Sequence, residues 1–397
     1  MSIEDRINLE SILSYARACI EVARTFAKLG DQGYRHAIVP SRGASPIEDG
    51  AKSYFFGVVD TAVNGKVRFG LRSRYTYGPL CNPLYLPFTA DSCKELGDIQ
   101  SHEIRRFYAR TVAAVVRGDL TNPHYRFLSY IRDNVCRIGF RSIVEDRIRS
   151  GCFIFLDTVV SGQAICEIID AFGAEGLNEC HYVLVIDANG SRLKAEYRVR
   201  LEHLAALGRA TLIKVESLFT EDQGPAVSGI WCLTCPELML IAREEIPAFR
   251  DGAIGAGVYY CEVQKRDDES NLAVTLGAGS IHRFLWKAVQ IVADPETVMN
   301  DLDDSGHLDD TFNPDSISRR AEYLLPWFKE EIEEYLEECR RFRSFDQEMT
   351  RRIAEPKVRQ SVIGSPKLGV SSSHCLRLHY SRDEAARLVR DFRRTLT

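Results

Sequence analysis

Apolar runs and helical segments alternate between residues 152 and 218, and this rhythm constrains the fold more than any other feature of the chain. The expected strands are "CFIFLD", "HYVLVID" and "ATLIKVESL", and segments with helical spacing, 163–176 and 191–208, separate them. Strands that are apolar throughout and joined by helices are typical of a parallel sheet covered on both faces. The sequence therefore predicts an α/β fold with a doubly wound, mostly parallel sheet.

The remaining segments divide the chain into regions. Helical spacing predicts a helix over 3–29 and, opened by Pro46, another over 46–63, while the aromatic, Gly- and Pro-rich stretch 66–88 is expected to form a hairpin or mobile loop. The expected regions are an N-terminal helix (1–34), an α/β core (35–245) with a helical insertion at about 90–150, a hairpin and helix (246–295), and a charged, mainly helical C-terminal extension (296–397).

Composition indicates a soluble protein of a reducing compartment. The 397 residues carry a formal net charge of −5, which gives no general reason to expect a polyanionic partner. The 12 cysteines are scattered and no secretory segment opens the chain, so we expect free thiols and a cytoplasmic location. No apolar run approaches the roughly 20 residues that a membrane span needs, and we expect no membrane association.

Charge is unevenly distributed in the C-terminal extension. Residues 294–339 contain 15 acids and 3 bases, whereas residues 340–397 contain 14 bases and 6 acids. Two solvated helical faces that pack near each other would explain this pattern. The alternative is a basic tail that contacts nucleic acid or a phosphorylated protein partner.

Two loops at expected strand ends carry the candidate ligand-binding residues. Ligands of doubly wound sheets bind outside the carboxyl ends of the strands, and the candidates here are "VPSRGASP" and "LDTVVSGQA". In the second, Ser161, Gly162 and Gln163 open a helix whose N–H groups and dipole suit a phosphate. Asp157 suits sugar hydroxyls or a metal-bound water. A generic strand–turn–helix with Ser161 as N-cap, or another nucleotide or sugar-phosphate site, would give the same pattern.

The stretch "FIFLDTVVSGQAICEI" resembles the signature of the type I phosphoribosyltransferase family. That signature is an apolar strand, two adjacent acids, three variable residues, Thr or Ser, Gly, and a helix. "HAIVPSRGASPI" looks like the pyrophosphate loop of the same family, and the resemblance spans about 35–240. It implies a sheet of the phosphoribosyltransferase kind that binds phosphoribosyl pyrophosphate (PRPP) with Mg²⁺, which needs few protein ligands, and it makes 246–295 a candidate hood over the base.

The resemblance also implies roles for individual residues. Asp157 and Arg42 are the expected catalytic residues, and a homodimer is expected because the family's mobile loop often closes between subunits. The full implied set is Asp157, Thr158, Val159, Val160, Ser161, Gly162, Gln163 and Ala164 for PRPP and phosphate, Ser41, Arg42 and Gly43 for pyrophosphate, and Arg72, Arg74 and Tyr75 for the mobile loop.

Two departures from the family pattern leave the activity open. Leu156 replaces the first of the two acids, which should weaken ribose binding by about 1.5–3 kcal/mol, and Leu156→Asp should restore it if this is the only defect. Val160 stands where several purine-specific members place an acid that serves as general base, so no side-chain general base is expected at this loop. The expected function is transfer of phosphoribose to or from a base or other nucleophile. The alternative is an inactive PRPP or nucleotide sensor that acts on a partner through its C-terminal extension, for example in bacterial regulation or antiviral defence.

Three further motifs are expected to be structural features and not binding sites. "DLDDSGHLDDTF" resembles a calcium loop, but Phe312 replaces the final acid, so an acidic linker is expected. Cys232 and Cys235 have metal-ligand spacing without a second pair, so we expect buried thiols and no protein-bound metal. His282 lies in an apolar helical segment and is expected in the core, with base recognition as the alternative.

Overall fold

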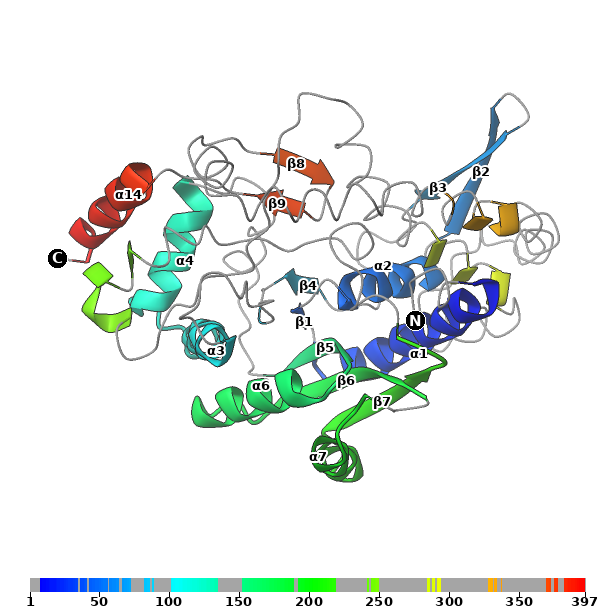
Figure 1. Ribbon diagram of the computed structural model, residues 1–397, viewed down its shortest axis with the longest axis horizontal. Coiled ribbons are helices and arrows are strands. Elements are labelled where there is room, and N and C mark those ends of the chain that lie inside the picture. Colours follow the sequence, from blue (N-terminus) through cyan, green and yellow to red (C-terminus); the bar gives the residue numbers. More distant parts are fainter. Residues whose placement is uncertain are drawn as a thin grey trace.

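The computed structural model describes the parts of the chain that form its central sheet and the helices around it (Figure 1). The described residues are 8–34, 36–40, 43–55, 57–63, 66–72, 82–85, 88, 101–134, 152–188, 192–218, 241–242, 244–249, 284–285, 288–289, 291–293, 328–330, 332–333, 337, 369–372, 375–377 and 382–396.

A parallel sheet forms the centre of the protein. In the described part of the chain it has five strands in the order β4 (Asn82–Tyr85), β1 (His36–Val39), β5 (Phe153–Val159), β6 (Cys180–Asp187) and β7 (Ala210–Val215). Every neighbouring pair in this sheet is parallel. The prediction of an α/β fold built on a parallel sheet is therefore confirmed.

Helices cover both faces of this sheet, as a doubly wound fold requires. Helices α1 (Leu9–Asp31) and α2 (Ala44–Phe55) pack on one face. Helices α3 (Ser101–Arg117), α6 (Gln163–Ala174) and α7 (Ala195–Ala206) pack on the other. Successive side chains of a strand point to opposite faces, and the apolar residues of β1, β5, β6 and β7 are divided between two separate cores accordingly.

Strand β5 shows how this division works. Phe153 and Phe155 lie in the core with α3 and α6, whereas Ile154 and Leu156 lie in the core with α1 and α2, and all four are fully buried. A strand that is buried on both faces must be apolar at every position, which is why "FIFL" shows no alternation in the sequence.

The segment after β1 differs from the prediction. The expected helix over 46–63 ends at Phe55, and β2 (Gly57–Val63) pairs antiparallel with β3 (Lys66–Arg72) to form a two-stranded ribbon. Gly57 disfavours continuation of the helix, and the valines and threonine that follow favour a strand. Strand β4 lies at the end of the described sheet, where Pro83 is tolerated because an edge strand leaves some N–H groups unpaired.

The C-terminal part of the chain returns to the helical insertion. Helix α4 (Pro123–Asn134) begins at the predicted Asn-Pro signal, with Asn122 Oδ1 accepting from the His124 N–H at 2.9 Å. Helix α14 (Arg382–Arg394) lies beside α4 at the end of the molecule opposite the β2–β3 ribbon (Figure 1). The remaining described elements are η2 (Pro247–Phe249) and the antiparallel pair β8 (Gly369–Ser372) and β9 (Cys375–Arg377).

None of the helices in the described ranges is both long enough and apolar enough to span a lipid bilayer.

Candidate functional site

The strand order brings the two predicted loops to the same place. Strand β1 lies between β4 and β5, so the chain leaves β1 toward one side of the sheet and later returns to its other side. This reversal is the topological switch point at which doubly wound folds bind ligands. Ile38 of β1 is paired in parallel with Phe155 of β5, so the carboxyl ends of the two strands point toward the same edge of the sheet. Both predicted loops therefore begin at that edge.

Asp157 lies inside β5 and not at its end. The strand continues to Val159, and Asp157 is paired in register with Leu184 of β6. The predicted strand end at Asp157 was therefore two residues too early. Alternation directs the Asp157 side chain to the face of α3 and α6, where it is 2% exposed, and its Oδ1 accepts from the Thr158 N–H at 2.9 Å. A carboxylate this deeply buried needs partners for its charge.

The turn between β5 and α6 has the geometry of an anion-binding loop. Val160 and Ser161 are partly exposed, Gly162 adopts a left-handed conformation with φ 87° and ψ −14°, and α6 begins at Gln163. Ser161 Oγ lies 3.4 Å from the Gln163 N, whose N–H it accepts. The following N–H groups of a first helical turn have no intrahelical acceptor. Gln163 is exposed and Ala164 is partly exposed, so an anion could approach the first turn of α6.

Residues from the segment between β6 and α7 close one side of this turn, and sequence reasoning missed them. The Lys194 N–H donates to the Ser161 carbonyl at 3.2 Å, and the Lys194 Nζ lies 5.7 Å from the Tyr197 ring centroid. A Cβ built on Gly162 would lie 2.7 Å from Leu193 and 2.5 Å from Tyr197. The small size of Gly162 is thus required by these neighbours, in addition to any approach of a ligand. Lys194 adds an exposed cation beside the loop.

Aromatic packing holds α6 in place against the sheet. The ring of Phe172 is fully buried and meets the rings of Phe153 and Phe155 edge to face, with centroids 5.5 Å apart in both pairs. Phe88 contacts Phe172 in the same way at 5.4 Å. Each such pair contributes about 0.5–1.5 kcal/mol beyond the area it buries. The N-terminus of α6 is thereby fixed relative to Asp157.

The other predicted site residues are less completely placed. Gly43 is buried immediately before α2, whereas Ser41 and Arg42 lie outside the described residues. Arg72 is the last residue of β3, paired with Gly57 in the separate ribbon that Figure 1 shows projecting from the body. The other predicted positions outside the described residues are Arg74, Tyr75, Cys232, Cys235, His282 and 301–312.

Helix α2 carries buried charges that sequence reasoning also missed. Glu48 and Asp49 are 2% and 5% exposed, and the Lys52 Nζ lies 2.6 Å from Glu48 Oε1 and 3.7 Å from Asp49 Oδ1. Burial would lower the pKa of Lys52, but the two carboxylates outweigh it and the pKa is raised. These charges follow the β1 loop by about one helical turn. The signal was the Glu48–Asp49 pair four and three residues before Lys52 in the same helical segment.

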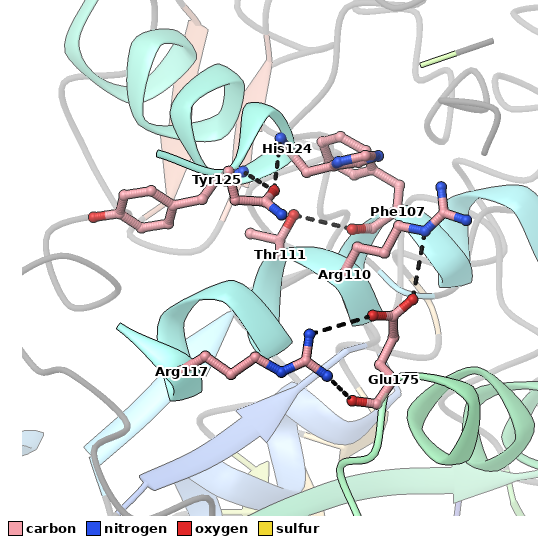
Figure 2. Close-up of polar contacts among 8 residues, drawn as sticks. Phe107, Arg110, Thr111, Arg117, His124, Tyr125 and Glu175 are labelled. Atoms are coloured by element: carbon pink, nitrogen blue, oxygen red, sulfur yellow. Dashed lines mark hydrogen bonds and ion pairs between the residues drawn. The ribbon is translucent and has the colours of Figure 1, made fainter. Parts of the chain in front are cut away.

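The helical insertion is tied to α6 at both ends of that helix. Near its start, Arg105 of α3 donates to Glu167. At its C-terminal end, Glu175 lies 3.5 Å from the Arg110 Nε and 3.9 Å from the Arg117 Nη1, and its carbonyl accepts from Arg117 (Figure 2). These contacts fix α3 along α6 and therefore beside the loop that opens it.

Comparison with known proteins identifies no relative. No family model, no curated protein and no solved structure matches the chain. Within the ranges that the structure describes, no group of three or more His, Cys, Asp or Glu side chains is arranged to hold a metal ion. Functional inference therefore rests on the geometry of the switch point.

Proposed function

We propose that the protein binds PRPP or a ribose 5-phosphate nucleotide at the switch point and transfers phosphoribose to or from a base or another nucleophile. The observation that supports the proposal is the strand order, because β1 and β5 are parallel neighbours and both candidate loops begin at their carboxyl ends. Residues 160–164 would hold the 5-phosphate, and Asp157 would accept a hydrogen bond from a ribose hydroxyl. The 5-phosphate and the ribose hydroxyls lie at the two ends of one ribose 5-phosphate, so a single ligand would contact both.

The loop after β1 would hold the pyrophosphate. Ser41, Arg42 and Gly43 lie in sequence between β1 and α2, so α2 would present its N-terminus to the same anion. Transfer breaks the bond between ribose C1 and pyrophosphate and joins C1 to the nucleophile, and groups that stabilise the departing charge accelerate it. Arg42 would supply a bidentate clamp for that charge.

Magnesium would enter with PRPP. The ion would be held mainly by the oxygens of its ligand and by water. Asp157 of β5 is the carboxylate that would contact a metal-bound water. Val160 is partly buried against the core of α1 and α2, so the loop offers no side-chain base at this position, and the nucleophile would have to be activated elsewhere.

A sensor is the second candidate function, and the position of α14 favours it. Phe392 of α14 packs on Phe127 of α4 with ring centroids 5.0 Å apart, and Arg126 donates to the Thr395 carbonyl. Helix α4 packs on α3, and α3 is joined to α6 by the Arg105–Glu167 ion pair. A continuous path of packed side chains thus links the C-terminal helix to the candidate site, and occupancy of the site could bias it.

Calorimetric titration of PRPP, with and without Mg²⁺, tests the proposed ligand. Wild-type protein should bind, and Asp157→Asn, which keeps the side-chain shape, should weaken binding by about 10- to 150-fold, the equivalent of one charged hydrogen bond. Asp170→Asn, at an exposed position of α6, is the matched control and should bind like wild type. A folded wild-type protein that gives no heat would exclude PRPP as the ligand.

Two further measurements separate transfer from sensing. Pyrophosphate release in the presence of a panel of bases would establish the enzyme. Hydrogen exchange of residues 382–396 that slows on PRPP binding, without any pyrophosphate release, would establish the sensor.

A further inference from the structure

Arg105 is a buried cation whose position is not explained by stability. It is 6% exposed, its Nη1 donates to Glu167 Oε2, and its Nε has no hydrogen-bond partner among the described residues. Burying a guanidinium and a carboxylate together is often no better than packing apolar side chains of the same volume. The ion pair therefore calls for a second role.

Glu167 links this buried cation to the opening of α6. One carboxylate oxygen, Oε2, accepts from Arg105, while the other, Oε1, accepts from the Gln163 Nε2 at 2.8 Å. Gln163 is the first residue of α6, and its N–H reaches Ser161 Oγ. Hydrogen bonds therefore connect Arg105 of α3, through Glu167 and Gln163, to the turn at Ser161.

The charge of Glu167 is a problem for an anion site. Its carboxylate belongs to a residue about one helical turn beyond Gln163, so an uncompensated negative charge there would repel a phosphate held at the N-terminus of α6. The same carboxylate is needed to orient Gln163. A buried arginine on the far side of Glu167 cancels the repulsion while leaving Oε1 free for Gln163.

We infer that Arg105 is a positioning residue of the proposed phosphate site: it neutralises Glu167 and so allows Glu167 to hold Gln163 beside a bound anion. This inference rests on the proposed function and assigns the helical insertion a part in ligand binding. If Arg105 is a positioning residue, substituting Arg105 and substituting Glu167 should change PRPP affinity in opposite directions. If the ion pair is only structural, both substitutions should weaken binding.

Three variants distinguish the two interpretations. Arg105→Met removes the compensating charge and should weaken PRPP binding by about three- to twentyfold at low salt. Coulomb's law gives this range for one unit charge about one helical turn from the anion. Glu167→Gln keeps a side-chain oxygen for Gln163 but removes the negative charge, so it should bind PRPP more tightly than wild type. The double variant should return to within about twofold of wild type, and all differences should shrink as salt is raised.

The Arg200–Asp170 ion pair provides the control. It joins α7 to a later turn of α6, with Arg200 Nη1 donating to Asp170 Oδ2 at 3.1 Å. Arg200→Met and Asp170→Asn should each change PRPP affinity by less than about twofold because screening grows with distance. Equal weakening by Arg105→Met and Glu167→Gln would overturn the inference and leave an interhelical ion pair. A wild-type protein that does not bind PRPP would overturn the proposed function and the inference with it.

Discussion

The Cα of Gly162 faces Tyr197 so closely that a Cβ at position 162 would come within 2.5 Å of the Tyr197 Cβ. The backbone at Gly162 is also left-handed, with φ 87°. Gly162→Ala should therefore lower the free energy of unfolding by about 2–5 kcal/mol, the sum of a left-handed alanine and an overpacked contact. Urea denaturation measures this loss.

Gly208 is the matched control for that substitution. It is also left-handed, with φ 70°, but a Cβ there would meet nothing within 4 Å. Gly208→Ala should cost about 1–2 kcal/mol from the backbone alone. Equal losses at the two positions would mean that Tyr197 and Leu193 can move aside.

Leu156→Asp should destabilise the protein and not restore ribose binding. Leu156 is fully buried in the core with α1 and α2, on the face of the sheet opposite Asp157. An acid there would be shut off from solvent among apolar side chains, and we expect a loss of more than about 4 kcal/mol. The expectation that this variant tightens PRPP binding does not hold for this geometry. Leu207→Asp, at a leucine that is 59% exposed, should change stability by less than about 0.5 kcal/mol.

Phe392→Ala should release α14 from the rest of the protein. Phe392 is 1% exposed and packs on Phe127 and Tyr130, with centroids 5.0 and 5.3 Å apart. Loss of a buried phenyl ring costs about 3–5 kcal/mol. We expect this to exceed the free energy that holds the terminal helix α14 against the protein. Limited proteolysis should then cut within 382–396. Arg390→Ala, on the exposed face of the same helix, should leave the protease pattern unchanged.

His124 should make the protein less stable in mild acid. The side chain is 6% exposed, its ring lies 5.2 Å from Phe107 and 5.1 Å from Phe249, and its Nε2 has no partner among the described residues. Burial, and then the positive charge of Arg110, lower its pKa to about 4. Figure 2 shows Arg110 joined to Glu175 by an ion pair.

The direction of the pH dependence follows from that pKa. Unfolded histidine titrates near pH 6.5, so on acidification the unfolded chain binds a proton before the folded protein does. The free energy of unfolding should therefore fall between pH 6.5 and 4, by up to about 3 kcal/mol from this residue. Urea denaturation at pH 7 and pH 4.5 measures the slope. His124→Gln should flatten it, and an unchanged slope would assign the dependence to other groups.

Local patterns predicted the strands and the loops at their ends. The apolar runs before α6 and α7 became β5 and β6 within about two residues of the expected bounds, because a strand buried on both faces has to be apolar throughout. The Ser-Gly turn did open a helix, since glycine alone adopts φ 87° without strain. The residue pattern wrongly predicted a helix at 57–63. Helical spacing and strand propensity compete there, and pairing with β3 selects the strand.

The sequence by itself thus determined a parallel α/β core and the turn at Ser161–Gln163, because burial on two faces and a glycine-opened helix leave local traces in the residue order. The tertiary structure alone decided that β1 lies beside β5, that Leu193 and Tyr197 close over Gly162, and that Arg105 reaches Glu167. Those contacts join residues separated by tens of positions, and strand order and helix packing depend on the free energy of the whole core rather than on any local pattern.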